Sequence, residues 1–206
     1  MSIFTYAPLG DAQLDRFQQN VARAFLRVEA LLLELQETVE PMAMVRVATK
    51  PITSTAGASF DGLKGDADDT LGYVLRYRAR PASTGTSVAL RINGDTGASA
   101  YRWALATQAS DGSLATGGGS DVANMIRLSS TSANPGHVIT GTVTIPVSRR
   151  GEARHVHADT IESNVFRGDY ARGSWVNTTD EIKRIDILSI FGTLNDGVAT
   201  LYRMVR

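Results

Sequence analysis

The chain has 206 residues, in which 21 Lys and Arg residues balance 21 Asp and Glu residues, so its formal net charge is zero. This balance excludes a general electrostatic attraction to nucleic acid or to an acidic membrane surface. The sequence has no cysteine, which excludes disulfides and thiolate metal sites. The length suits one sizeable core with an appended element.

A long amphipathic helix is predicted between Asp11, a suitable N-cap, and Pro41, which ends the pattern. Over roughly 29 residues the apolar positions recur at spacings of three and four, the heptad pattern of a coiled coil. The apolar face comprises Leu14, Phe17, Val21, Ala24, Phe25, Val28, Leu31, Leu32 and Leu35. Charged residues in its most apolar part, such as Arg27 and Glu29, exclude a membrane span.

This apolar face is broader than the seam of a two-stranded coiled coil, so two alternatives are open. The helix packs either in a bundle of three or more copies or on a globular core of its own chain. Each large side chain left in water would forgo roughly 1.5 to 3 kcal/mol of burial. The helix is more than twice the ordinary mean length, and it precedes a region with its own two-sheet pattern. We therefore expect residues 1–41 to form a helical oligomerisation and docking arm.

Residues 42–206 are predicted to form a mainly β domain, an antiparallel, jelly-roll-like β-sandwich. Strands are expected at residues 44–49, 73–78, 88–92, 101–105, 125–128, 139–147, 154–158, 182–191 and 198–205. The dipeptide Asn93-Gly94 is a strong signal for a turn after the third of these. Gly117–Gly119 is predicted as a flexible hairpin loop, because a phosphate-binding loop would need a lysine opening a helix.

The clearest strand is the one at residues 139–147. Its apolar residues are Ile139, Val143, Ile145 and Val147, and they alternate with Thr140, Thr142 and Thr144. This pattern is typical of an antiparallel sheet with one buried face and one face in water.

Several segments of this region resemble, in sequence and in order, the β-sandwich modules of small tailed-phage virion proteins. They are Leu71–Arg78, Val88–Asp95 with Tyr101 after it, Gly173–Trp175, Ile182–Ile187 and Gly197–Tyr202. Such modules occur in capsid decorations, head fibres, collars, and tail or baseplate appendages. The resemblance covers roughly residues 70–206. The chain departs from it at the end, where the family more often places a glycine after the tyrosine.

The resemblance implies a viral structural protein without enzymatic activity, usually a homotrimer. It implies that the helical N-terminus attaches to other virion proteins of the capsid or tail, and that the sandwich faces outward as a capsid decoration, fibre or tail appendage. The expected location is the virion, assembled in the host cytoplasm. The resemblance supplies no catalytic residues.

Two histidines form the most suggestive metal motif. His155 and His157 are two apart on a predicted strand, so both imidazoles share one face. Two ligands are too few, and only Asp159 or symmetry copies could add a third, so we expect an exposed polar face and no metal or other cofactor. The acidic loop with Asp61, Asp66, Asp68 and Asp69 lacks the spacing of an EF-hand and is expected to be solvated.

Catalytic motifs are equally weak. The histidines, at positions 137, 155 and 157, form no recognisable triad or nucleophile elbow with a serine, so we do not expect an enzyme. A glycan-cleaving enzyme would need two carboxylates converging in a cleft. A basic stretch comprises Arg149, Arg150, Arg154, Arg167 and Arg172. Acidic residues are interleaved with it, which indicates a solvated face and not a nucleic-acid site.

Aromatic residues provide an alternative function, the binding of a host-surface glycan by a receptor-binding or carbohydrate-binding module at a phage tail tip. The candidates for stacking on a sugar are Tyr101, Trp103, Tyr170 and Trp175. The competing interpretation is that Trp103 and Trp175 belong to the core, because large aromatic residues are mostly buried.

Changing both Val21 and Val28 to Asp is expected to dissociate the oligomer, because two charges per copy would enter the apolar face of the helix. The measurement is the mass in solution by light scattering. A double variant that keeps the wild-type mass would contradict the prediction of an oligomerising helix.

Overall fold

The computed structural model describes residues 43–53, 57–65, 69–130, 135–147, 151–163 and 167–205, together with Arg27; for residues 119–123 it describes the backbone alone. The chain divides into two compact units, Met1–Pro41 and Met42–Arg206. The predicted oligomerisation helix and its apolar face lie outside the described residues. No described helix is long and apolar enough to cross a membrane.

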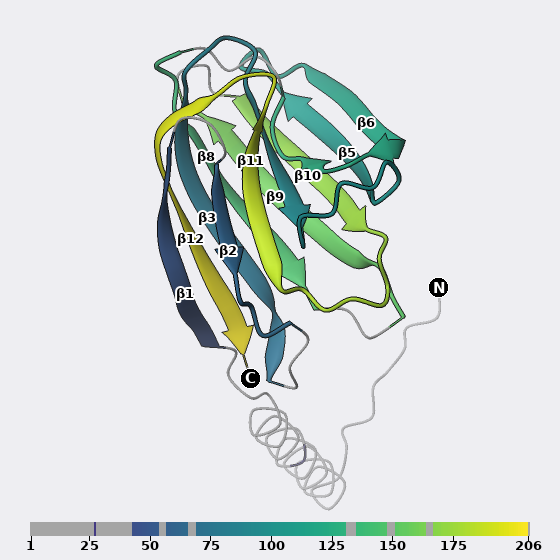
Figure 1. The fold of residues 1–206 in the computed structure, drawn as a ribbon. Helices are drawn as coiled ribbons and strands as arrows, with labels where there is room; N and C mark the ends of the chain where they lie inside the picture. Colours follow the sequence, from purple (N-terminus) through teal and green to yellow (C-terminus); the bar gives the residue numbers. More distant parts are fainter. Residues whose placement is uncertain are drawn as a thin grey trace, which may run out of the picture. The chain divides into compact units, whose positions relative to one another are not determined.

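The second unit is an antiparallel β-sandwich of two sheets (Figure 1), which confirms the predicted mainly β class. The larger sheet runs in the order β1 (Ala43–Ile52), β12 (Leu194–Val205), β3 (Thr70–Pro81), β8 (Ile139–Pro146), β9 (Arg154–Glu162), β10 (Arg167–Trp175), β5 (Tyr101–Gln108) and β6 (Leu114–Ala123). The smaller runs β2 (Ala58–Asp61), β11 (Arg184–Ile190), β4 (Ser87–Ile92) and β7 (Ile126–Arg127).

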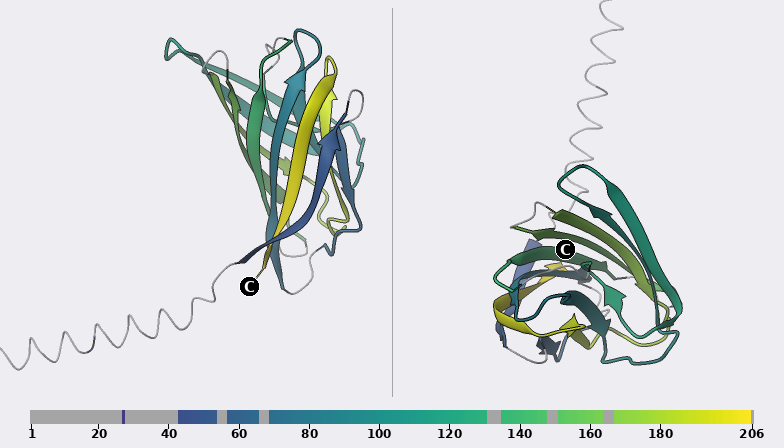
Figure 2. Two further views of the ribbon diagram at one scale, coloured as in Figure 1. Left: turned by 90° about the vertical axis from the view of Figure 1, so that its left-hand side faces the viewer. Right: turned by 90° about the horizontal axis from the view of Figure 1, so that it is seen from above.

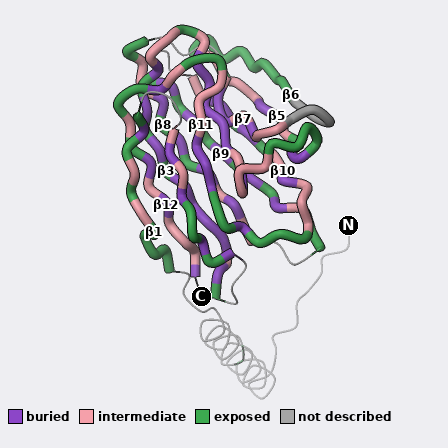
Figure 3. The backbone as a smooth tube through the Cα atoms, viewed as in Figure 1, coloured by how far each residue is buried: buried purple, intermediate pink, exposed green. Residues whose placement is uncertain are grey.

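The smaller sheet lies over one face of the larger one (Figures 1 and 2), and side chains from both form a single core. On β8, Ile139, Val143 and Ile145 are buried, whereas Thr140 and Thr142 on the other face are exposed. The prediction of one buried and one wet face is confirmed. Most buried residues belong to strands, whereas most residues of β1 and of the connecting loops are exposed (Figure 3).

The predicted number of strands was wrong: the described residues form twelve strands, not eight or nine. The strands that were missed are β2, β6 and β10. Strand β6 contains Gly117–Gly119, which the sequence predicts as a loop, and β10 has three residues of low strand propensity, Gly168, Asp169 and Gly173. Both β9 and β5 pair with β10, so hydrogen bonds on two sides override these weak local preferences.

A row of inward-facing residues crosses the centre of the larger sheet. Tyr77 on β3 is opposite Gly141 on β8, which is opposite Thr160 on β9. The tyrosine hydroxyl reaches across the glycine and shares a hydrogen bond of 2.8 Å with Thr160 Oγ1. A Cβ at position 141 would lie 2.5 to 2.6 Å from atoms of the Tyr77 ring, so only glycine leaves room for it. Burial raises the pKa of Tyr77, so the phenol stays protonated.

Changing Gly141 to Ala is expected to lower the free energy of unfolding by roughly 1 to 3 kcal/mol, because the added methyl group would overlap the Tyr77 ring. Chemical denaturation followed by tryptophan fluorescence measures the difference. Gly117→Ala is the matched control, since residue 117 is also in a strand and a Cβ there would meet nothing within 4 Å. Equal stabilities of wild type and Gly141→Ala would contradict this account of the row.

Candidate ligand-binding site

Two of the four candidate stacking residues belong to the core. Tyr101 is fully buried, and its hydroxyl donates to the carbonyl oxygen of Ile92 and accepts from the Ile92 N–H, both at 2.9 Å. Burial raises the pKa of Tyr101 above its ordinary value. Trp175 is also buried, and its Nε1–H donates to Asp95 Oδ2 at 2.8 Å. Because neither ring is open to a ligand, both candidates are withdrawn.

The other two candidates differ in the face they occupy. Trp103 is partly buried and packs against the core. Tyr170 lies on the outer face of β10, and half of its surface is exposed, at 50%. Tyr170 is therefore the one candidate of the four whose ring points away from the core.

The histidine pair is exposed on the outer face of β9, as predicted from its spacing. Opposite them on β10 lie Ser174 and Arg172, which do not extend a metal site. The described part of the chain contains no group of three His, Asp or Glu residues that could hold a metal ion.

Acidic and basic candidates lie partly outside the described residues, including Asp66, Asp68, Arg149 and Arg150. In the acidic loop, Asp61 pairs with Arg184 and Asp69 pairs with Arg203, each at 3.4 Å. In the basic stretch, Arg154 is buried, and its guanidinium donates to carbonyl oxygens that include Glu152 at 2.8 Å and Asp180 at 3.1 Å. The stretch is therefore not a uniform solvated face, because part of it organises loops.

An open hollow of about 410 Å³ borders Tyr170, and it is called the Tyr170 hollow below. Its lining comprises Gln108, Ala109, Ser110, Gly112, Ile161, Arg167, Gly168 and Tyr170. These residues come from the end of β5, the turn that follows it, and the adjoining ends of β9 and β10.

Small neighbours leave the Tyr170 ring accessible. Its hydroxyl end lies over Gly168, with ring atoms 3.6 to 3.8 Å from where a Cβ of residue 168 would be. On the adjacent strands, Tyr170 is opposite Ala106 of β5 and Asp159 of β9. A glycine and an alanine therefore flank the ring, where larger side chains would cover it.

Arg167 is the charged group in the lining, and two carboxylates hold it. Its Nη1 is 4.0 Å from Glu162 Oε2, and its Nε is 3.8 Å from Asp169 Oδ1. Asp169 is itself fixed, because it accepts hydrogen bonds from Thr107 Oγ1 at 2.6 Å and from the backbone N–H of Ser130 at 2.9 Å. The guanidinium is therefore mostly buried near two carboxylates, and its Nε has no hydrogen-bond partner among the described residues.

Apolar side chains gather on the same outer face. The exposed fractions are 67% for Leu114, 61% for Ile161 and 50% for Tyr170. Residues 114 and 161 belong to one register row across the sheet, through Gly168 and Gln108. The hollow therefore combines apolar contact area with the polar groups of Gln108 and Arg167.

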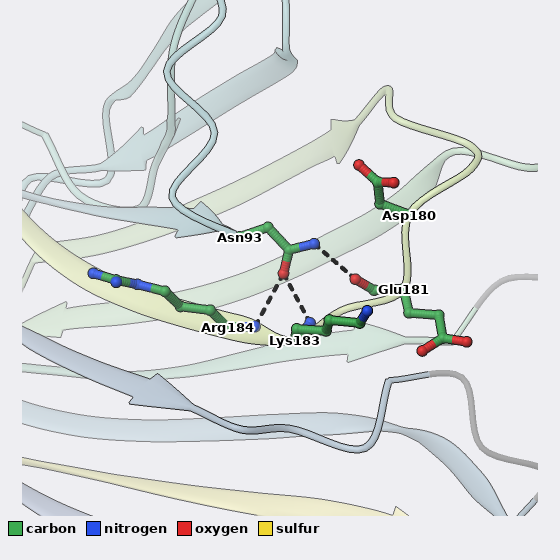
Figure 4. Close-up of a pocket in the computed structure, with 5 residues that line it drawn as sticks. All are labelled: Asn93, Asp180, Glu181, Lys183 and Arg184. Atoms are coloured by element: carbon green, nitrogen blue, oxygen red, sulfur yellow. Dashed lines mark hydrogen bonds between the residues drawn. The ribbon is translucent and has the colours of Figure 1, made fainter.

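A second hollow, of about 330 Å³, lies at the turn after β4 and is lined by Asn93, Asp180, Glu181, Lys183 and Arg184 (Figure 4). The Asn93 amide donates to the carbonyl oxygen of Glu181 at 2.7 Å, and its oxygen accepts from the N–H groups of Lys183 and Arg184 at 2.8 and 3.0 Å. The Asn93 side chain therefore holds this loop in place through hydrogen bonds to its backbone. The carboxylates of Asp180 and Glu181 point apart, so they do not form the facing acid and base of glycoside hydrolysis.

The sequence identified Tyr170 but not the residues around it. Gln108, Ile161 and Gly168 were not candidates, because β10 was not predicted and the face of each residue could not be assigned without it. From the sequence, Asp159 is a possible third metal ligand and one of the acidic residues interleaved with the basic stretch. The alternation of β9, with His157, Asp159 and Ile161 on one side, was the signal that could have placed Asp159 on an open face.

Comparison with known proteins does not assign a family. No family model matches the sequence, and no curated protein matches it. Among solved structures, the CBM40 of the Ruminococcus gnavus IT-sialidase bound to α2,3-sialyllactose has 12% identity, with 69% of this chain and 91% of that chain covered and a TM-score of 0.23. The metal-free lectin I-B4 from Griffonia simplicifolia has 12% identity, 82% and 92% coverage and a TM-score of 0.19. Likenesses this weak carry no argument about the ligand.

Proposed function

We propose that this protein is a non-enzymatic binding module whose jelly-roll-like sandwich holds a carbohydrate in the Tyr170 hollow. The observation that carries the proposal is an exposed tyrosine ring, supported on one side by Gly168 and bordered by an open hollow. Aromatic faces pack against the apolar C–H faces of sugar rings.

The polar groups of the lining suit the rest of a sugar. Gln108 both donates and accepts hydrogen bonds, so the hydroxyl groups of a sugar find partners of both kinds. The size of the hollow falls within the range of roughly 300 to 1,000 Å³ for small-ligand sites. All these side chains stand on paired strands or tight turns, which keeps the site preorganised.

Changing Tyr170 to Ala is expected to abolish glycan binding on an array or weaken it at least roughly tenfold, because the stacking surface is lost. The melting temperature should change little, since the ring is exposed. Phe191→Ala is the matched control, because Phe191 is an exposed aromatic residue, at 72%, in the turn between β11 and β12. The absence of any binding by the wild-type protein would contradict the proposal.

A second candidate function is that of a homo-oligomeric component of a phage particle, the trimer of a capsid decoration, fibre or tail appendage that the sequence resemblance implies. The observation that favours self-association is the edge strand β1. Met44, Val45 and Val47 are exposed on it, at 47%, 47% and 43%. Strand β1 ends the larger sheet, and among the described residues only β12 pairs with it along its length.

Long apolar edge strands are normally protected in monomeric proteins, because their free backbone groups can pair with other chains. In β1 the protection lies in the second half, where a register shift follows Arg46 and Pro51 removes a backbone donor. The first half of the strand, Ala43–Arg46, contains neither a register shift nor a proline. This half follows the predicted helical arm directly in sequence, which supports an assembly surface shared by the two.

Changing Met44 and Val45 to Lys is expected to reduce the mass of the wild-type oligomer in solution, because charged edge residues oppose pairing between strands. Sedimentation or light scattering measures the mass. Leu114→Lys is the control, since it also places a lysine at an exposed apolar position, on β6 at the opposite edge of the sheet. A wild-type protein that is monomeric at micromolar concentration would exclude this candidate.

A further inference from the structure

We infer that Asp159, which lies beside the Tyr170 hollow and not among its lining residues, determines which sugar binds there: one without a carboxylate, whose hydroxyl groups bind the Asp159 side chain while its apolar face packs on Tyr170. This inference rests on the proposed carbohydrate-binding function. It adds the ligand class and a specificity-determining residue.

The register of the sheet brings the two residues together. Asp159 and Tyr170 are directly opposite each other on the antiparallel strands β9 and β10. Both side chains are exposed on the outer face of the sheet. Residues opposite each other have Cβ atoms roughly 4.5 to 5.5 Å apart, so one sugar ring can touch both side chains. Beyond Asp159 on the next strand lies Thr142, whose small side chain leaves the carboxylate open.

The chemistry of a free carboxylate suits hydroxyl groups. In the described part of the chain, the Asp159 carboxylate makes no ion pair and no hydrogen bond. An ionised carboxylate has two acceptor oxygens and no donor, so it can receive hydrogen bonds from two neighbouring hydroxyls of a sugar. Hydrogen bonds to a charged acceptor are stronger than those between neutral groups.

The surrounding charges disfavour an acidic sugar. Arg167, the cation in the lining, already lies between Glu162 and Asp169. Arg172 is two residues from Tyr170 on the same face of β10, opposite His157, on the side away from Gly168 and the hollow. The charge directly opposite Tyr170 on the neighbouring strand is the negative charge of Asp159, and it opposes the carboxylate of a sialic or uronic acid.

The test compares neutral oligosaccharides with the same oligosaccharides carrying a terminal sialic acid or uronic acid, titrated against wild type and Asp159→Asn. Wild type is expected to bind the neutral member of a pair roughly tenfold more tightly or better. Asp159→Asn keeps the shape but removes the charge. It is expected to weaken neutral binding roughly tenfold and to narrow the difference between neutral and acidic ligands.

His155→Asn is the control, because His155 is exposed on the same face of the same strand, four residues from Asp159. The His155→Asn variant should bind the neutral and the acidic oligosaccharides as tightly as the wild-type protein does. A wild-type preference for acidic sugars, or an unchanged ratio in Asp159→Asn, would overturn the inference and leave the carbohydrate-binding function standing. If no oligosaccharide bound to wild type, or if Tyr170→Ala bound as well as wild type, both proposals would fail.

Discussion

The hydrogen bond between Tyr77 and Thr160 fixes the register on which the rest of the larger sheet depends. The two residues are two strands apart, and the tyrosine ring crosses Gly141 to reach its partner. The same inward row continues from Thr160 to Asp169 and then to Thr107, which donates to the Asp169 carboxylate. A slip of one residue would exchange the two faces of a strand and break this row. In the observed pairing, Tyr77 and Thr160 bond to each other and Thr107 bonds to Asp169.

The pairing of this inner row also determines which residues are opposite each other on the outer face of the sheet. Because Thr160 is opposite Asp169, the preceding and following residues, Asp159 and Tyr170, are also opposite each other on the other face. Asp169 and Glu162 in turn hold the Arg167 guanidinium at the hollow. A buried polar network of this kind is costly unless its members are paired. Here the register of the network also places an exposed aromatic ring and a free carboxylate opposite each other on the outer face of the sheet.

Much of the fold could be predicted from the sequence, because apolar and polar residues alternate clearly in strands such as β8. Strand β10 could not, since it is central in the sheet but carries Gly168, Gly173 and the buried Asp169, none typical of a strand interior. The position of β10 in the sheet depends on its pairing with the neighbouring strands β9 and β5 and not on its own sequence pattern. For the same reason, the sequence reduced the aromatic candidates to four but could not select Tyr170, because selection requires knowing which residues face outward.

The two proposed surfaces can operate at the same time. In the order of the larger sheet, β1 and β10 are separated by β12, β3, β8 and β9. Five spacings between neighbouring strands amount to roughly 24 Å, so a partner that pairs with the β1 edge would not cover the Tyr170 hollow. A single open site with one stacking ring binds a sugar weakly. Several copies held together would raise the effective concentration of the remaining hollows once one is occupied. Assembly through the β1 edge would thus strengthen sugar binding at the Tyr170 hollows without any new contact to the sugar.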